Sequence, residues 1–144
     1  MDAALAEAEA AAARGEVPVG CAIVDGASGA IVARAGNRMR EAGDPTRHAE
    51  LEAIRAAVAA LGAARLEGCD LYVTLEPCPM CAQAISFARI RRLYYGAADP
   101  KGGGVAQGAR IFDQKTCHHR PEIYAGIGEA RAAQLLRDFF ATKR

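Results

Sequence analysis

A strand that runs directly into a helix is the feature that most limits how this chain can fold. Residues 69–76, CDLYVTLE, are rich in β-branched and aromatic residues, which favour a strand. They lead into PMCAQAISFARI, residues 79–90, where Pro79 suits the first turn of a helix. A further strand is expected over residues 91–97, RRLYYGA. Strands that alternate with helices in this way predict an α/β fold.

The other parts of the chain continue this alternation. Residues 17–37 contain two apolar runs joined by a Gly/Ser turn, which predicts a β-hairpin. The segment DPTRHAELEAIRAAVAALG has large apolar residues at spacings of three and four, which predicts an amphipathic helix ending at its last glycine. The remaining expectations are a helix over residues 2–14, a glycine-rich loop over residues 99–110 and a terminal helix over residues 129–144.

The length of the chain indicates one domain. A chain of 144 residues buries roughly two-thirds of its surface without help from disulfides. No repeat or long linker divides it, so we expect a single domain over residues 1–144. No apolar run approaches the roughly 20 residues of a membrane span, and the acidic N-terminus lacks the basic region of a secretory signal. A cytoplasmic protein without membrane contact is therefore expected.

The motif PCPMC, residues 77–81, allows three interpretations. Its cysteines, Cys78 and Cys81, lie at the junction of strand and helix, where a helix dipole stabilises thiolates. Such a pair suits a redox motif, half of a structural zinc site or part of a catalytic zinc site. The five cysteines of the chain are an odd number, which argues against a disulfide framework.

The segment HAE, residues 48–50, favours the catalytic interpretation. His48 and two cysteines make three zinc ligands and leave the fourth tetrahedral position open for water, as in catalytic sites. A closed structural site would need a fourth ligand from the other cysteines and histidines, none of which is paired with CxxC spacing. HxE followed by PCxxC is the pattern of zinc-dependent deaminases, in which the glutamate moves protons and does not bind the metal. We therefore predict that His48, Cys78 and Cys81 bind zinc and that Glu50 is catalytic.

Beyond these motifs, the chain resembles the bacterial tRNA-specific adenosine deaminases over nearly its whole length. HAE and PCxxC belong to the wider deaminase superfamily, whereas DPT, ARIRR and LLRDFF point to the tRNA branch. The matching segments, in chain order, are GEVPVG, GNR, DPTRHAE, LYVTLEPCPMC, ARIRRLYYGAADPKGG, HHRPEI and LLRDFF.

The resemblance implies a fold, a cofactor and a reaction. The fold is the three-layer α/β/α cytidine-deaminase-like fold, with a central mixed five-stranded sheet flanked by helices. One zinc ion per subunit is implied, in a homodimer that binds the anticodon loop of a tRNA. Hydroxide formed at the zinc attacks C6 of the wobble adenosine. Glu50 delivers protons to N1 and to the leaving amine, and ammonia departs to leave inosine.

The resemblance also assigns residues to the substrate. Asn37 would orient the base, with the backbone N–H of Ala49 near it. Asp99 would contact the ribose and Lys101 a phosphate beside the flipped nucleotide. The residues alone also allow plainer roles, a turn asparagine after a strand and a polar turn.

The C-terminal part of the chain is basic. Residues 1–88 hold seven Lys and Arg residues against twelve Asp and Glu, whereas residues 89–144 hold eleven against five. By the resemblance, Phe139 and Phe140 are an aromatic pair in which one ring packs inward and the other meets an unstacked base. The same part carries the family's RNA-binding segments, so a phosphate-binding surface is expected there. Solvated charge and core packing of both rings are the plainer alternatives.

Two positions depart from the family pattern. Arg47 stands where alanine is usual before HAE, and His118 stands where asparagine is common. Two other functions also remain open. A zinc deaminase of a free base or nucleoside, such as guanine, cytosine or cytidine, would share every catalytic residue and need no basic surface. A structural-zinc or redox module would lack deaminase activity altogether.

Overall fold

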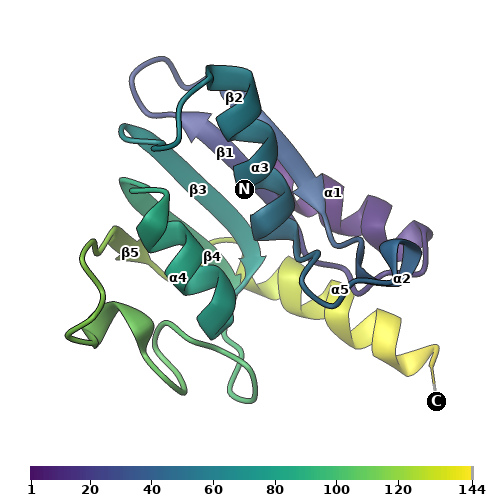
Figure 1. Ribbon diagram of the computed structural model, residues 1–144. Coiled ribbons are helices and arrows are strands. Elements are labelled where there is room, and N and C mark those ends of the chain that lie inside the picture. Colours follow the sequence, from purple (N-terminus) through teal and green to yellow (C-terminus); the bar gives the residue numbers. More distant parts are fainter. Residues whose placement is uncertain (144) are drawn as a thin grey trace.

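A mixed five-stranded sheet forms the middle layer of the computed structural model, which describes residues 1–143 (Figure 1). The strands are β1 (Gly20–Asp25), β2 (Ile31–Gly36), β3 (Cys69–Leu75), β4 (Arg92–Ala97) and β5 (Glu122–Tyr124). Their order across the sheet is β2-β1-β3-β4-β5. β1 pairs antiparallel with β2 and with β3, whereas β4 runs parallel to β3 and to β5. The predicted mixed sheet and the predicted hairpin are confirmed.

Helices cover both faces of this sheet. They are α1 (Asp2–Ala13), α2 (Met39–Ala42), α3 (Ala49–Leu61), α4 (Pro79–Phe87) and α5 (Glu129–Ala141), with a short 3-10 helix η1 (Ile111–Asp113). α3 and α4 lie on one face, and α1 and α5 lie on the other (Figure 1). Alternation along β1 produces these two faces, since Cys21 and Ile23 join the core with Ala53 of α3, whereas Gly20 faces α1. The predicted three-layer α/β/α fold is confirmed.

Small residues let α1 lie very close to the sheet. Ala4, Ala8 and Ala11 are on its buried face. A Cβ atom added to Gly20 would lie 1.9 Å from the carbonyl oxygen of Ala4, so no side chain fits at that position.

The buried face of α3 consists mostly of small residues. Its buried members are Ala49, Glu50, Ala53 and Ala57. Leu61, one of the large apolar residues that predicted this helix, is 50 % exposed, and Ile54 and Val58 are only partly buried. The large apolar side chains therefore flank the contact with the sheet, and the close approach of α3 carries Glu50 into the interior.

The cysteine motif lies at the carboxyl end of a parallel strand pair. β3 and β4 pair in parallel, and α4 makes the crossover between them. Cys78 has extended backbone, with φ −69° and ψ 170°, and Pro79 opens the helix. α4 ends at Phe87 instead of residue 90, and Arg89 then adopts a left-handed φ of 61°.

Short elements differ most from the sequence-based expectations. β5 has three residues, too few to show an alternating pattern, and only the family resemblance implied a fifth strand. α2 has four residues and was not expected. The terminal helix ends at Ala141 instead of residue 144, and Arg144 lies outside the described residues. Within residues 1–143, no helix is both long enough and apolar enough to span a membrane.

One row of aromatic side chains crosses three neighbouring strands. The rings of Tyr72 on β3 and Tyr94 on β4 are stacked with centroids 4.4 Å apart, and Tyr94 and Tyr124 on β5 are stacked at 4.9 Å. Tyr72 pairs with Ala22 and so projects from the same face as Gly20, opposite α3.

Candidate active site

Three predicted ligands meet where α3 and α4 begin. His48 directly precedes α3, Cys78 directly precedes α4, and Cys81 lies in the first turn of α4. His48 Nδ1 is 3.6 Å from Cys78 Sγ and 3.4 Å from Cys81 Sγ. One donor atom from each of the three residues lies within 4.8 Å of the others. Two helix N-termini, from segments thirty residues apart in sequence, thus converge on one point.

These separations fit a zinc ion. With Zn–N and Zn–S bonds of about 2.0 and 2.3 Å, a tetrahedral site separates nitrogen and sulfur by about 3.5 Å. The two observed nitrogen-to-sulfur distances are 3.6 and 3.4 Å. No fourth His, Cys, Asp or Glu of residues 1–143 joins the group, so one coordination position stays free of protein ligands. The other two histidines of the chain, His118 and His119, do not belong to it.

Without a cation, one of the two sulfurs holds the proton. A hydrogen bond from Cys81 lowers the pKa of Cys78 to about 4, and the same bond together with burial raises the pKa of Cys81. A hydrogen bond with Cys78 raises the pKa of His48. The lowered pKa of Cys78 favours the thiolate, which is the form that binds metal.

Glu50 lies beside the ligands in the first turn of α3. It is buried, and its Oε2 lies 3.4 Å from Cys81 Sγ. Burial raises the pKa of Glu50 above its ordinary value. A buried carboxyl group with a raised pKa can both accept and return a proton.

A cavity of about 280 Å³ opens in front of these groups. Its lining includes His48, Glu50 and Cys78 together with Asn37 and Asp99. Other lining residues are Val17, Val19, Met39, Leu75, Glu76 and Gly102. The walls are largely apolar with a few polar groups, as in pockets that bind small organic groups.

Asn37 and Ala49, both predicted to contact substrate, are hydrogen-bonded to each other. The backbone N–H of Ala49 donates to Asn37 Oδ1 at 2.9 Å. Asn37 Nδ2 donates to the carbonyl oxygen of Val17 at 3.1 Å. Asn37 is buried and lines the cavity, whereas Ala49 is fully buried behind it.

A second, larger cavity adjoins the first. Its volume is about 740 Å³, and Val17, Leu75 and Asp99 line both cavities. Lys101, Phe140 and Lys143 also line it, with Ala98 and Leu136 completing the wall. The larger cavity therefore extends from the smaller cavity to the face of α5.

The two phenylalanines of α5 occupy different environments. Phe140 is 49 % exposed and lines the larger cavity. Phe139 is half-buried, packs edge-on against Phe140 at 5.4 Å and lies beneath the Lys143 ammonium group at 5.0 Å.

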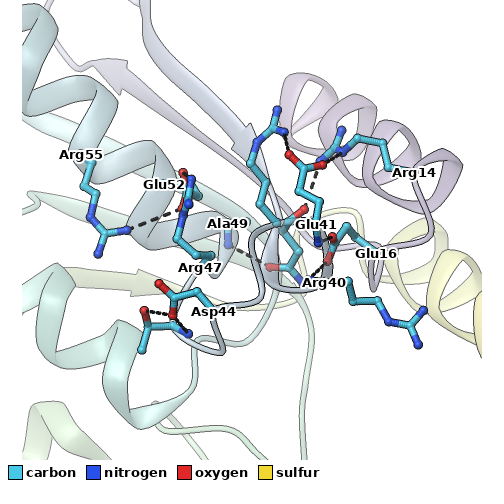
Figure 2. Close-up of polar contacts among 12 residues, drawn as sticks. Arg14, Glu16, Arg40, Glu41, Asp44, Arg47, Ala49, Glu52 and Arg55 are labelled. Atoms are coloured by element: carbon cyan, nitrogen blue, oxygen red, sulfur yellow. Dashed lines mark hydrogen bonds and ion pairs between the residues drawn. The ribbon is translucent and has the colours of Figure 1, made fainter.

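Sequence reasoning missed two buried glutamates that hold the walls of the site. Glu16, between α1 and β1, accepts hydrogen bonds from the backbone N–H groups of Arg40 and Glu41, each at 2.9 Å (Figure 2). Glu76, directly after β3, accepts several backbone hydrogen bonds from the loop that contains Asp99. The only available sequence signal was a lone acidic residue next to apolar segments, which is a weak one.

Arg47, which departs from the family pattern, has a structural explanation. Its guanidinium group makes a two-point ion pair with Glu52, in which Nη2 lies 3.1 Å from Oε2 (Figure 2). Arg55 approaches the same carboxylate at 3.6 Å. Arg47 therefore stabilises the start of α3, next to His48. His118 is exposed, and nothing in the structure explains its replacement of the usual asparagine.

The fold and the ligand group together define a zinc-dependent deaminase, a hydrolase that acts on a C–N bond. Residues 1–97 match the cytidine and deoxycytidylate deaminase zinc-binding region, a span that contains His48, Glu50, Cys78 and Cys81. The chain belongs to this cytidine and deoxycytidylate deaminase family, and its cofactor is zinc.

Relatives place the chain more narrowly within the family. It is 59 % identical to a tRNA-specific adenosine deaminase of Agrobacterium fabrum, over 100 % of this chain and 93 % of the relative. A solved structure from work on A-to-I editing by tRNA deaminases at the wobble position matches with a TM-score of 0.91 and 59 % identity, covering 94 % of this chain and 97 % of that one. A guanine deaminase of Bacillus subtilis matches with a TM-score of 0.66 and 32 % identity, covering 99 % of this chain and 90 % of the other.

Proposed function

We propose that this enzyme deaminates adenosine to inosine at the wobble position of a tRNA anticodon loop. The observation that carries the proposal is the continuity of the two cavities. A cavity of about 280 Å³ beside the zinc ligands suits one base, and the adjoining cavity of about 740 Å³ has Lys101, Lys143 and Phe140 in its wall. A free base would leave this second cavity unused, whereas neighbouring nucleotides of an RNA strand would fill it. The 59 % identity to a tRNA-specific adenosine deaminase supports the same substrate.

Each residue of the site then has a chemical role. Zinc, held by His48, Cys78 and Cys81, supplies when bound a water molecule acidic enough to lose its proton near neutral pH. Glu50 accepts that proton and delivers it to N1 of adenine. It then takes the proton of the hydroxyl group added at C6 and passes it to the exocyclic amine, so that the C6–N bond breaks and ammonia leaves. Its burial keeps the carboxyl group away from bulk water during these transfers.

Asn37 holds the base in this arrangement. Its Oδ1 is used by the Ala49 N–H, and one Nδ2 hydrogen is used by Val17, which fixes the amide. The second Nδ2 hydrogen is then available to an acceptor nitrogen on the purine. In this proposal Ala49 acts through Asn37.

Asp99, Lys101 and Phe140 contact the RNA outside the base pocket. Asp99 lines both cavities and suits a ribose hydroxyl, whereas Lys101 suits a phosphate. The exposed ring of Phe140 offers a stacking surface for an unpaired base. Phe139 supports it from the side.

The proposal extends to assembly and location. One deaminase domain spans residues 1–144 and forms a cytoplasmic homodimer. Met80 and Phe87, seven residues apart on one side of α4, are 37 % and 70 % exposed, and these apolar side chains suit burial against a second copy. Light scattering should give twice the chain mass, and Phe87→Ser should shift it toward the monomer.

The decisive experiment compares RNA with free bases. The zinc-loaded enzyme is incubated with an anticodon stem-loop that carries adenosine at the wobble position, and separately with guanine, cytosine and cytidine. Inosine in the RNA, without ammonia from the free compounds, is the expected result. Ammonia from guanine, with unchanged RNA, would instead assign the activity of the Bacillus subtilis relative.

A further inference from the structure

Glu76 is a buried carboxylate whose hydrogen-bond partners are backbone N–H groups. It is 2 % exposed and lies between β3 and the zinc-binding PCPMC turn. One oxygen, Oε1, accepts from the Asp99 N–H at 3.1 Å. The other, Oε2, accepts from three consecutive N–H groups, those of Val105, Ala106 and Gln107, at 3.2, 3.0 and 3.1 Å. Four donors on one carboxylate tie both ends of the loop over residues 99–107 to a single point.

The loop is built to fit around this carboxylate. A Cβ atom on Gly103 would lie 2.5 Å from Glu76 Oε2 and 2.6 Å from the Asp99 carbonyl oxygen. A Cβ atom on Gly104 would lie 2.5 Å from the backbone nitrogen of Pro79. Gly104 also donates its N–H to the Pro77 carbonyl oxygen at 2.8 Å. The glycine-rich loop therefore packs directly on the turn that carries Cys78.

The hydrogen bonds continue from Glu76 to the substrate side of the loop. Asp99, fixed through its N–H by Glu76, accepts with its Oδ1 from the N–H groups of Lys101 and Gly102, at 3.2 and 2.9 Å. Glu76 thus sets the position of Asp99, and Asp99 sets the backbone of Lys101. These two residues line the larger cavity.

We propose that Glu76 is a positioning residue for RNA binding, because it fixes the loop over residues 99–107 at a set distance from the zinc ligands. The proposal rests on the function proposed above, since it assigns Asp99 and Lys101 to the RNA. Glu76 itself does not act on the reacting atoms. A role in positioning predicts weaker substrate binding with the metal and the chemical step preserved, whereas a purely structural role predicts lower stability alone.

The substitution Glu76→Gln tests this with little change of volume. A glutamine has one acceptor oxygen, and if that oxygen keeps the three N–H groups of residues 105–107, its NH₂ group faces the Asp99 N–H. Two donors then oppose each other, and Asp99 is released. Asp70→Asn is the matched control. Asp70 is a buried carboxylate at the start of β3, the strand that Glu76 directly follows, and its partner is Arg91 at 2.8 Å.

Three measurements are made on the zinc-loaded variants. Glu76→Gln should keep one zinc per chain, lose protection of the Asp99 amide in hydrogen exchange, and raise KM for the anticodon stem-loop by about tenfold with kcat little changed. Asp70→Asn should keep the wild-type KM even if its melting temperature falls. Three results would each overturn the proposal. They are an unchanged KM and unchanged amide protection in Glu76→Gln, loss of zinc in Glu76→Gln, and a rise in KM for Asp70→Asn equal to that of Glu76→Gln.

Gly103→Ala provides a second route if Glu76→Gln does not fold. The added methyl group displaces the carboxylate without removing it, so the same rise in KM with retained zinc is expected. A wild-type KM in a folded Gly103→Ala protein contradicts the proposal. Amide exchange and zinc content can be measured without any substrate. If the wild-type enzyme does not act on RNA, but Glu76→Gln still loses protection of the Asp99 amide, the proposed function is refuted while the role of Glu76 in holding the loop is not.

Discussion

The backbone N–H of Ala49 donates a 2.9 Å hydrogen bond to Asn37 Oδ1, which joins the end of β2 to the first turn of α3. This bond connects the residue next to a zinc ligand with the residue proposed to hold the base. Because Asn37 Nδ2 also donates to Val17, the orientation of the amide is fixed before any substrate binds. The base pocket is therefore pre-organised by hydrogen bonds within the protein.

Asn37→Asp should keep the acceptor oxygen of this side chain and remove its NH₂ donor. The aspartate still accepts from Ala49, but its second oxygen faces the Val17 carbonyl oxygen and offers no hydrogen to the base. We expect a loss of about 1–3 kcal/mol in the free energy of unfolding, the usual cost of an unsatisfied buried group. A fall of at least about tenfold in kcat/KM is also expected. Chemical unfolding and inosine formation measure the two effects, and wild-type kcat/KM would refute the role in base binding.

Glu50→Gln should abolish turnover while the metal stays bound. Glutamine preserves the shape of the side chain but cannot carry protons, so kcat should fall by at least about 100-fold. Metal analysis should still give one zinc per chain. The control is Glu52→Gln, since Glu52 lies one half-turn further along α3 and pairs with Arg47. Substantial activity in Glu50→Gln would exclude Glu50 as the proton carrier.

Cys78→Ala should release zinc and lower stability together. A ligand that binds only the folded chain stabilises it by about 2.7 kcal/mol when its concentration is 100 times Kd. Removing one of three protein ligands removes most of that gain, and a chelator should destabilise the wild type similarly. Cys117→Ala is the matched control, because Cys117 contacts Ser86 outside the zinc group. Full zinc content and an unchanged melting temperature in Cys78→Ala would contradict the ligand assignment.

The ion pair of Arg47 and Glu52 should stabilise the protein in a pH-dependent way. The hydrogen bond from Arg47 lowers the pKa of Glu52 below the ordinary value of 4.5. The stabilisation is present above that ordinary value and is lost as the pH falls through the depressed value in the folded state. Arg47→Ala should therefore lower the melting temperature at pH 7 more than at pH 3. An equal decrease at both pH values would show that Arg47 acts by packing alone.

Phe140→Ala should weaken RNA binding more than Phe139→Ala. Phe140 is 49 % exposed in the wall of the larger cavity, whereas Phe139 is half-buried beside it. Stacking of a base on an aromatic side chain contributes about 1–3 kcal/mol, so Kd for the stem-loop should rise about tenfold or more in Phe140→Ala. Binding is measured by titration at fixed salt. Equal effects from the two substitutions would favour a shared role in the packing of α5.

Much of the fold could be predicted because its longer elements have clear periodicity and ends. The hairpin, β3, β4 and the helices α1, α3 and α5 follow the expected segments within a few residues. β5 could not be predicted from its residues, because it is a three-residue strand stabilised by pairing with β4. The buried face of α3 was also not evident, since its alanines carry less hydrophobic signal than Ile54 and Val58, which flank it.

The zinc ligands could be predicted because metal chemistry restricts both residue type and spacing. One donor atom from each of His48, Cys78 and Cys81 lies within 4.8 Å of the others, so these three residues could hold one ion. Roles that depend on tertiary contacts left no such signal. Nothing in the sequence shows that Asn37 and Ala49 share a hydrogen bond, or that Glu76 gathers four N–H groups from a loop more than twenty residues away.

The stacked row of Tyr72, Tyr94 and Tyr124 gives this protein a built-in optical probe. The chain has four tyrosines and no tryptophan, so these three rings dominate its near-ultraviolet absorption and fluorescence. Their close stacking exists only while β3, β4 and β5 remain paired. Near-ultraviolet circular dichroism should therefore follow the opening of this half of the sheet, on the face away from the metal, without any added label. Separation of the strands can then be followed by this signal, while removal of zinc is measured separately by metal analysis.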